Sequence, residues 1–378
     1  MTVNKWNIKF QRSSHLSWQP AKETSKQIAV LMSGGVDSSV TAHLLKEQGW
    51  DVLGITMKIP VSCNAGKRGC CGADAAFVCN ELGIAHYFVD VTEPFEKLII
   101  EPFRRSYANG QTPNPCADCN TFLKFSLVWD FLEQTFGITY LATGHYARIS
   151  KTGGRAHLGI AKDKSKDQSY FLYGISAEKL DKLVLPLGEL TKKKVRSIAA
   201  GIDLTVAEKA ESMELCFVGE GNYRLALTDE QANRTGDLTD MQGSRIGTHK
   251  GIANYTIGQR QGLGFAGGRP LYVGKIDART NTVALGTREE VCFRIVKAEK
   301  VNAMMPGELI AGGQFFGKIR SYGNPRLCGL VDFDGARMTV EFDQPQFAPC
   351  PGQRLVLYNS DGSIVAGGTI SAETINTG

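Results

Sequence analysis

Apolar and polar positions follow two different patterns along the chain. In its first part, short apolar runs alternate with segments in which apolar residues recur at helical spacing. The runs at 28–32, 52–57, 87–91 and 138–143 predict strands that are buried on both faces, because polar side chains rarely interrupt them. Strands that alternate with helices predict βαβ units, and therefore an α/β fold with a doubly wound parallel sheet.

The helical stripes lie between and after these runs, at residues 38–48, 75–82, 95–103, 122–136 and 190–200. Pro102 is expected to kink or end the third of these helices. Thr191 is expected to open the last one as its N-cap. The lysines at 192–194 favour a solvated helix face over an RNA-binding patch, because charge runs usually face water.

The pattern changes from about Gly219, where helical stripes fade and glycines become frequent. Beyond Val291, short alternating runs separated by turn dipeptides predict a small antiparallel β-barrel. The expected organisation is a loose N-terminal extension (1–25), a catalytic domain (26–218), a central domain (219–291) and the barrel (292–378).

Composition limits the function classes. The 378 residues carry 43 basic and 38 acidic side chains, and this mild excess permits a nucleic-acid partner without requiring one. No apolar run approaches membrane length, and the first 25 residues lack the apolar core of a signal peptide. Ten cysteines without a secretion signal predict a reducing, cytoplasmic location, with some thiols serving chemistry or metal binding.

Residues 33–39, read Ser-Gly-Gly-Val-Asp-Ser-Ser, follow the first apolar run and open a helix. Gly34 and Gly35 let backbone N–H groups approach an anion, and a helix N-terminus favours negative charge. The alternative is an ordinary strand–turn–helix connection. No Gly-Lys-Ser/Thr ending is present, so this is not a P-loop. The stretch resembles the loop of the ATP pyrophosphatase superfamily, which implies ATP cleavage between the α and β phosphates, with Asp37 helping to hold Mg²⁺ or the phosphates.

Thiols form the second candidate site. Cys116 and Cys119 stand at C-x₂-C spacing before a helix, whose N-terminus lowers a thiol pKa. One such pair is compatible with redox chemistry, half a zinc site or part of an iron–sulfur site. Cys216 taken alone is most simply a buried apolar thiol. The remaining cysteines are expected not to be catalytic, and they are Cys63, Cys70, Cys71, Cys79, Cys292, Cys328 and Cys350.

Six motifs occur in a specific order: the pyrophosphate loop, residues 112–125, 142–146, 166–171, 215–217 and 255–260. Together they resemble the bacterial tRNA-specific 2-thiouridylases, which place sulfur on C2 of uridine 34, the wobble base. The resemblance runs from about Ile28 to the C-terminus. It implies a pyrophosphatase domain, a small central domain and a C-terminal β-barrel.

The resemblance also implies roles for individual residues. Cys119 matches the nucleophilic cysteine, and Cys216 matches the cysteine that carries a persulfide. ATP with Mg²⁺ is the implied cofactor. The ATP contacts implied are Leu31, Met32, Ser33, Gly34, Gly35, Val36, Asp37, Ser38, Met57 and Gly144.

A tRNA anticodon stem-loop is the implied partner, together with an upstream sulfur donor such as a cysteine desulfurase or a sulfur relay protein, and no membrane is involved. The positions that match tRNA contacts are Asn114, Pro115 and Cys116 facing the base, His145 and Gln353 near the uridine, Lys166, Asp167 and Gln168 elsewhere, and Arg320 and Ser321 on the barrel.

The chain departs from the family pattern at Cys116, where many relatives have Asp. Cys116, Cys119 and Cys216 then resemble the three-cysteine set of sulfur-inserting relatives that hold a [4Fe-4S] cluster with one open iron. A third soft ligand makes little sense as a base, so the substitution favours the cluster. The persulfide route stays open. The barrel motif also departs from the pattern, at residues 321–323.

Two rival functions remain. The same fold could adenylate a different tRNA base or a small molecule, but such reactions need no thiol, and the paired cysteines oppose this. The chain could also be a non-catalytic, metal-stabilised RNA-binding protein, which the intact pyrophosphate loop opposes.

Overall fold

The computed structural model describes residues 3–19, 26–60, 71–210, 215–218, 234–265 and 268–375. The hypotheses about Cys63 and Cys70 fall outside these residues. The chain forms two compact units, each described here by itself. The first unit consists of Met1–Leu98 and Asp118–Gly221, and the second consists of Ile99–Ala117 and Asn222–Gly378.

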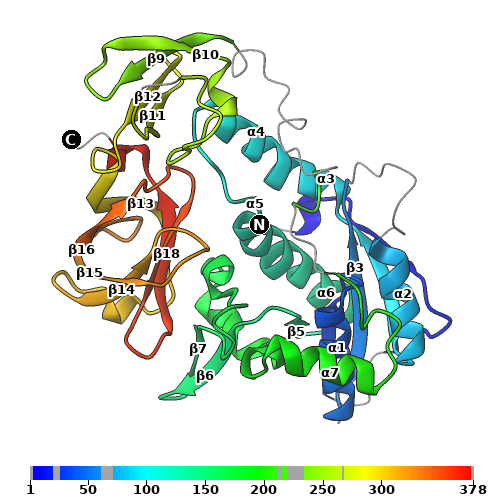
Figure 1. Ribbon diagram of the computed structural model, residues 1–378. Coiled ribbons are helices and arrows are strands. Elements are labelled where there is room, and N and C mark those ends of the chain that lie inside the picture. Colours follow the sequence, from blue (N-terminus) through cyan, green and yellow to red (C-terminus); the bar gives the residue numbers. More distant parts are fainter. Residues whose placement is uncertain are drawn as a thin grey trace. The chain divides into compact units, whose positions relative to one another are not determined.

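A six-stranded sheet forms the centre of the first unit (Figure 1). Its order is β1-β4-β3-β2-β5-β8, and every neighbouring pair except β1–β4 is parallel. This confirms the predicted doubly wound α/β sheet. The strands are β1 (Lys9–Arg12), β2 (Gln27–Leu31), β3 (Asp51–Lys58), β4 (Ala85–Asp90), β5 (Tyr140–Thr143) and β8 (Leu183–Val184).

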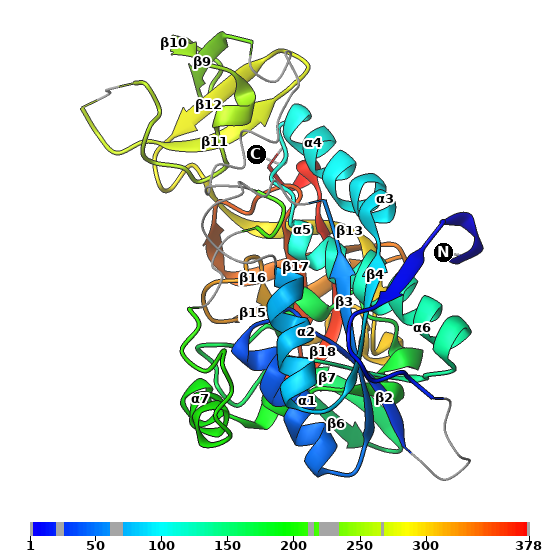
Figure 2. The same cartoon turned by 90° about the vertical axis from the view of Figure 1, so that its right-hand side faces the viewer.

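Helices cover both faces of this sheet, with α2 and α6 on opposite sides (Figures 1 and 2). Ile28 and Val30 of β2 pack with Val40 of α1 and Val195 of α7 in one buried core. The helical segments that begin in this unit are α1 (Val36–Glu47), α2 (Cys71–Glu81), α3 (Thr92–Phe95), the π-helices η2 (Glu96–Ile100) and η3 (Cys119–Val128), α6 (Trp129–Phe136) and α7 (Lys192–Gly201).

Shorter elements complete the first unit. They are the 3₁₀ turns η1 (Val3–Lys5), η4 (Ser169–Leu172), η5 (Ala177–Lys182) and η6 (Pro186–Glu189), and the hairpin of β6 (Arg148–Thr152) with β7 (Arg155–Gly159).

The N-terminal residues are more ordered than expected. Residues 1–25 were expected to form a loose extension, but β1 adds to the sheet edge, with Lys9 opposite Asp90. The Ser13 N–H donates to the His86 carbonyl at 3.0 Å, and the His86 N–H donates to Ser14 Oγ at 3.0 Å. Backbone groups make this attachment, so the apolar pattern of the sequence does not report it.

Pro102 was expected to kink or end a helix, and it does not end one. Glu96–Ile100 form a π-helix, and α4 (Glu101–Ala108) then continues past the proline. Pro102 stands in the first turn of α4, where a missing N–H costs little.

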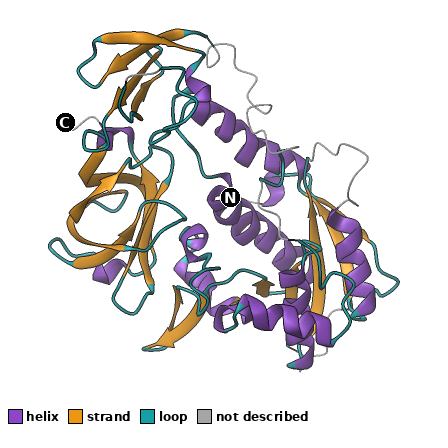
Figure 3. Ribbon diagram, in the orientation of Figure 1, coloured by secondary structure: helices purple, strands orange, loops and turns teal. Residues whose placement is uncertain are grey.

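The second unit consists mostly of strands (Figure 3). A closed barrel of order β13-β16-β15-β14-β17-β18 has antiparallel pairs throughout, which confirms the predicted C-terminal barrel. A second sheet, of order β10-β9-β12-β11, has its own buried core around Leu238, Tyr255 and Val283.

The strands of that second sheet are β9 (Gly236–Asp240), β10 (Arg245–His249), β11 (Tyr272–Asp277) and β12 (Thr282–Gly286). The barrel strands are β13 (Cys292–Ala303), β14 (Gln314–Lys318), β15 (Arg326–Phe333), β16 (Arg337–Phe347), β17 (Arg354–Tyr358) and β18 (Ile364–Ile370). The helical turns outside the barrel strands are α5 (Pro115–Asp118), η9 (Ile252–Asn254), η10 (Pro306–Glu308) and η11 (Ala372–Ile375).

Candidate active site

The predicted pyrophosphate loop connects β2 to α1 at the carboxyl end of the sheet. Gly34 has a φ of 69°, a conformation that a Cβ would disfavour. Ser38 Oγ accepts a hydrogen bond from the Ser33 N–H at 3.2 Å and donates to the Gly35 carbonyl at 3.1 Å. Ser39 Oγ also donates to the Gly35 carbonyl, at 2.9 Å. The hydroxyls of Ser38 and Ser39 therefore brace the loop from within.

Gly144, directly after β5, lies against this loop. A Cβ on Gly144 would lie 2.8 Å from both the Asp37 carbonyl carbon and the Ser38 nitrogen. Strands β2 and β5 are neighbours, and the sheet connections leave in opposite directions from them, which is where such sheets bind ligands. The structure thus brings the loop and Gly144 together, as predicted. Met57 is half-buried near the end of β3.

Asp37 is held by two residues from distant segments. Lys192 Nζ lies 2.8 Å from each carboxylate oxygen, and the Tyr146 hydroxyl donates to Oδ1 at 2.8 Å. The Lys192 side chain is only 12% exposed, and its ammonium lies 5.7 Å from the centroid of the Tyr146 ring. The interpretation of 192–194 as a solvated face was therefore wrong for Lys192.

A second lysine reaches the loop from the segment after α7. Lys209 Nζ donates to the Gly34 carbonyl at 2.8 Å and pairs with Asp74 at 2.5 Å. The sequence analysis missed both Lys192 and Lys209. A lysine in the first turn of a helix is unfavourable next to the positive end of the helix dipole. The position of Lys192 at the start of α7 was therefore the sequence feature that could have indicated a special role for it.

His145 lies beside the loop and is half-buried. Its Nδ1 shares a hydrogen bond of 2.7 Å with Thr143 Oγ1. Burial, with the Lys124 charge nearby, lowers the pKa of His145 well below its usual range. The imidazole is therefore neutral near pH 7.

Residues 166–168, expected to contact tRNA, hold their own segment together. Asp167 accepts hydrogen bonds from the Ala161 and Ser169 N–H groups at 3.0 and 3.2 Å. Gln168 Oε1 accepts from the Tyr146 N–H at 2.9 Å. The Gln168 contact holds the loop between β5 and β6 that carries Tyr146, the partner of Asp37.

Two of the three candidate thiols belong to the first unit. Cys119 begins η3 and is 8% exposed. Cys216 is exposed, so the interpretation of it as a buried apolar thiol was wrong. Its neighbour Phe217 is buried and packs edge-on against Phe95, with ring centroids 5.8 Å apart. This contact anchors the turn that displays Cys216.

Cys116 lies in the second unit, within α5, and is exposed. The segment before it is held by the barrel. Gln353 Nε2 donates to the carbonyls of Thr112 and Pro113, both at 3.1 Å, and Asn114 Nδ2 donates to Gln353 Oε1 at 3.4 Å. Asn114 and Gln353, both expected near the target base, are thus brought together.

Sequence profiles of known families match along the chain. The profile described as "tRNA methyl transferase HUP domain" matches residues 26–220, more than half of the chain. The profiles "tRNA methyl transferase PRC-barrel domain" and "Aminomethyltransferase beta-barrel domain" match residues 226–287 and 293–370.

Curated relatives match almost end to end. The tRNA-specific 2-thiouridylase MnmA of Clostridium botulinum is 40% identical over 92% of this chain and 98% of its own length. The chain belongs to the tRNA-specific 2-thiouridylase family. The MnmA proteins of Pelobacter propionicus and Lachnoclostridium phytofermentans are 43% and 41% identical, over 92% and 91% of this chain and 98% and 99% of their own lengths.

Solved structures align less closely with this member of the tRNA-specific 2-thiouridylase family. NMN synthetase from Francisella tularensis covers 55% of this chain and 75% of its own, with 16% identity and a TM-score of 0.32. A likeness this distant adds nothing to the assignment.

The barrel position implied by the family resemblance has an internal role here. Arg320 donates from one guanidinium nitrogen to the carbonyls of Phe347 and Ala348, both at 2.6 Å. Its guanidinium also lies 5.5 Å from the Phe347 ring centroid. Arg320 lies in the loop after β14 and therefore joins that loop to the end of β16. Ser321 beside it is half-buried.

Four other thiols of this 2-thiouridylase family member have a pKa above the usual value for cysteine. Burial raises the pKa of Cys79 and of Cys328 to about 12. Burial also raises the pKa of Cys350 and of Cys292. Because the thiolate is the nucleophile, these four are poor candidates for sulfur chemistry.

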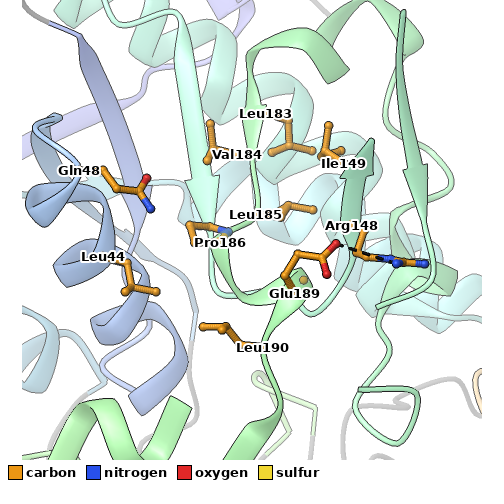
Figure 4. A pocket seen from close by; sticks show the side chains of 11 residues that line it. Leu44, Gln48, Arg148, Ile149, Leu183, Val184, Leu185, Pro186, Glu189 and Leu190 are labelled. Atoms are coloured by element: carbon orange, nitrogen blue, oxygen red, sulfur yellow. Dashed lines mark ion pairs between the residues drawn. The ribbon is translucent and has the colours of Figure 1, made fainter. Parts of the chain in front are cut away.

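A pocket of about 350 Å³ lies elsewhere in the first unit (Figure 4). Leu44 and Gln48 of α1 line it together with residues 183–186 and 188–190, and Arg148 pairs with Glu189 at its edge, at 3.9 Å. None of the ATP contacts implied for the 2-thiouridylase family lines this pocket.

A metal-binding group and a membrane-spanning helix are both absent from the residues that the structure describes. Over those ranges, no group of three or more His, Cys, Asp or Glu side chains is gathered in a way that could hold a metal ion. None of the helices found there is both long and apolar enough to cross a bilayer.

Proposed function

We propose that this protein catalyses the ATP-dependent 2-thiolation of uridine 34 in the tRNA anticodon. The observation that carries the proposal is the braced pyrophosphate loop against Gly144, in the same unit as Cys119 and the exposed Cys216. The 2-thiouridylase relatives, 40% identical over nearly the whole chain, support the substrate class.

The chemistry explains why a nucleotide loop and thiols belong in one enzyme. The C2 carbonyl of uracil is a poor electrophile without a leaving group. Attack of its oxygen on the α-phosphorus of ATP releases pyrophosphate and leaves AMP on that oxygen. Sulfur can then attack C2 and expel AMP. Reaching the base requires flipping it out of the loop stack, which costs less in an anticodon loop than in a duplex.

The ATP would lie across residues 31–38 and Gly144, with Met57 beside the base. Backbone N–H groups of the loop and the N-terminus of α1 favour the phosphates. Asp37 would help to hold Mg²⁺, because carboxylate oxygens are among its preferred ligands. Lys192, which now pairs with Asp37, would then be available to the phosphate oxygens.

Sulfur would reach C2 as the terminal atom of a persulfide on Cys216. After AMP leaves, that sulfur joins C2 to Cys216 Sγ through an S–S bond. The Cys119 thiolate attacks Cys216 Sγ and breaks that bond, so the sulfur stays on C2 and a Cys119–Cys216 disulfide forms. An external thiol reductant then reduces the disulfide, and an upstream persulfide donor reloads Cys216.

A [4Fe-4S] cluster on Cys116, Cys119 and Cys216 is the second candidate for the sulfur step. The donor chemistry suits it, since thiolates are the usual cluster ligands, and Cys116 replaces a frequent Asp. The three cysteines would hold the cluster, and its open iron would supply the sulfide that attacks the activated base.

The RNA side of the proposal uses both units. Asn114, Pro115 and Cys116 would face the target base, and His145 and Gln353 would lie near the uridine. Lys166 and Ser321 remain further proposed contacts. A cytoplasmic location suits the reaction, because its thiols need a reducing compartment.

Substitution of the two proposed working thiols tests the function. Cys119→Ser and Cys216→Ser should each lower tRNA thiolation by about a thousandfold or more, as loss of a nucleophile does in other enzymes. Both should still form AMP and pyrophosphate from ATP in the presence of tRNA. Cys328→Ser, at a buried barrel thiol, is the matched control and should keep full activity.

Three outcomes decide between the candidates. Finding ADP and phosphate as products would overturn the assigned cleavage site. Adenylation without sulfur transfer, in wild-type protein supplied with persulfide, would favour a rival acceptor. About four irons per chain after anaerobic purification, lost with activity in Cys116→Ala, would establish the cluster route over the persulfide route.

A further inference from the structure

Hydrogen-bonded side chains connect the N-terminal segment of the first unit with the pyrophosphate loop. The Ser13 hydroxyl bonds Nδ1 of His86, and Nε2 of the same ring lies 2.8 Å from Thr56 Oγ1. The Thr56 hydroxyl donates to the Met32 carbonyl at 2.9 Å. We call the side chains of Ser13, His86 and Thr56 the His86 network. Because Met32 directly precedes the loop, this network joins the segment after β1 to the entrance of the loop.

The donors and acceptors of the His86 network allow one arrangement of protons. The Met32 carbonyl can only accept, so Thr56 uses its single hydroxyl proton there, and His86 Nε2 must donate to Thr56. Burial lowers the pKa of His86 to about 4, so the ring is neutral near pH 7 and its Nδ1 carries no proton. Nδ1 therefore accepts from Ser13. Each member donates toward the loop, and hydrogen bonds aligned in this way polarise one another.

The network ends on the first peptide group of the pyrophosphate loop. The Met32 carbonyl and the Ser33 N–H belong to the same planar peptide unit. Thr56 of β3 holds its oxygen, and Ser38 Oγ of α1 accepts from its N–H at 3.2 Å. The orientation of this peptide is thus fixed from both sides. Turning it would also separate the Ser33 N–H from Ser38, which bonds the Gly35 carbonyl within the loop.

The imidazole at the centre of the network is enclosed by the sheet and by the N-terminal segment. His86 is fully buried, and its ring lies 5.1 Å from the Phe88 ring between centroids. Gly54 lies opposite His86 in the β3–β4 register, and a Cβ on Gly54 would lie 3.1 Å from Cδ2 of the imidazole. Ser13 supplies the outer end of the network, and it precedes residue 26, where the match to the family profile begins.

We propose that Thr56 and His86 are positioning residues for ATP, and that the N-terminal segment takes part in this positioning through Ser13. In this role, none of the three side chains touches the nucleotide. They hold the peptide between Met32 and Ser33 in the orientation that the loop needs to present its N–H groups to the phosphates. This inference rests on the proposed ATP-binding role of the loop.

Thr56→Val tests the inference, because it nearly keeps the shape of the side chain and removes the hydroxyl. The Met32 carbonyl then loses its donor, and the loop spends less time in its binding form. Equilibrium dialysis with Mg²⁺ and α,β-methylene ATP, which is not cleaved, should show about tenfold weaker binding, as if about a tenth of the molecules were competent. Thr56→Ser keeps a hydroxyl and should bind as wild type does. Ser13→Ala removes only the outer bond and should weaken binding less, by about threefold.

Thr374→Val is the matched control. Thr374 is fully buried in the second unit, where its hydroxyl donates to the Lys297 carbonyl at 3.1 Å and accepts from the Lys297 N–H at 2.9 Å. Both threonine-to-valine variants should lower the free energy of unfolding in urea. Thr374→Val should nevertheless bind the analogue with wild-type affinity, so a loss of stability alone cannot imitate the positioning role.

The His86 ring of the wild-type protein provides a second measurement. Histidine is labelled with ¹⁵N, and the ring signals of His86 are assigned by their loss in His86→Gln. The spectrum should show the proton on Nε2. Both ring signals should shift when the analogue saturates the loop, because the network transmits any change at the Met32 carbonyl. In Thr56→Val, saturation with the analogue should leave the His86 signals in place.

The two proposals fail in different ways. If wild type does not bind the analogue, the proposed function and this inference both fail. If wild type binds it, three results would each show that the positioning role is wrong while the proposed function stands. They are equal affinity in Thr56→Val, wild-type His86 signals that do not respond to the analogue, and a proton on Nδ1 in wild type.

Discussion

The pyrophosphate loop of the first unit and the Arg320 corner of the second unit use positive charge in opposite ways. In the loop, Lys192 and Lys209 arrive from distant segments and meet Asp37 and the Gly34 carbonyl. At the barrel corner, Arg320 lies 27 and 28 positions from its partners, and its guanidinium joins two consecutive neutral carbonyls.

The difference separates the proposed ATP-binding loop from a contact that stabilises the barrel. Asp37 has other suitable partners, because Mg²⁺ can replace Lys192 there and phosphates can take the lysine in exchange. The carbonyls of Phe347 and Ala348 accept hydrogen bonds from Arg320 within the second unit. A positive side chain therefore indicates ligand binding where a metal ion or phosphate can replace its present partner. Where no ligand can replace the partner, the charge contributes to the stability of the fold.

The largest expected effect comes from closing the space beside the loop. Gly144→Ala places a Cβ 2.8 Å from the backbone of Asp37 and Ser38, so the loop must shift. AMP formation should fall by about a hundredfold, as a displacement of roughly 1 Å does in other active sites. Gly201→Ala, where nothing lies within 4 Å of the added atom, should keep wild-type activity. Normal AMP formation by Gly144→Ala would show that the nucleotide does not use this crevice.

The next effect belongs to the barrel corner. Arg320→Met removes the hydrogen bonds to Phe347 and Ala348 and should lower the free energy of unfolding by about 2 kcal/mol, the range for bonds to a charged group. Urea unfolding monitored at the barrel measures this loss. A residue that also neutralised a phosphate would reduce the slope of log affinity for tRNA against log salt by about 1. We expect an unchanged slope, and a reduced one would restore Arg320 as an RNA contact.

The same contrast explains what the sequence could predict. The loop is encoded by consecutive residues, with Gly34 supplying a positive φ and Ser38 supplying local bonds, so a motif is enough. The buried runs likewise predicted four parallel strands, and the short alternating runs separated by turn dipeptides predicted the final barrel. These features depend on local conformation and on simple burial patterns.

The sequence could not predict which residues from distant segments would contact each other. Lys192 lies 155 positions from Asp37, and no local pattern reports such a pair, so the lysine run looked like an ordinary wet surface. The attachment of β1 uses backbone groups, which every sequence possesses. Cys216 was expected to be buried because its neighbours are apolar, yet among the described residues 215–218 Phe217 is buried while Cys216 is exposed.

A smaller effect is expected at the exchangeable ion pair. Lys192→Met should weaken ATP binding by about tenfold, or roughly 1.4 kcal/mol, through loss of one charge-assisted contact. The neighbouring Lys193 is exposed, so Lys193→Met should bind ATP as wild type does. Equilibrium dialysis with Mg²⁺ present measures both. Equal ATP affinities in the two variants would mean that the Lys192–Asp37 pair only stabilises the fold, as the Arg320 contacts do. The loop and the barrel corner would then use positive charge in the same way.

The smallest expected effect concerns pH and the histidine beside the loop. Burial lowers the pKa of His145 in the folded protein, while the unfolded chain titrates near pH 6.5. The unfolded state therefore binds more protons, and the stability that neutral His145 contributes is present above pH 6.5 and is lost as pH falls below it. Between pH 8 and pH 6 the free energy of unfolding should therefore fall, in the direction that the lowered pKa of His145 sets. His145→Gln should lack this part of the pH dependence when the two proteins are unfolded in urea at both pH values. If His145→Gln loses stability with falling pH as steeply as wild type does, water reaches the His145 ring in the folded protein. The space beside the loop would then be as hydrated as the exposed surface of the barrel.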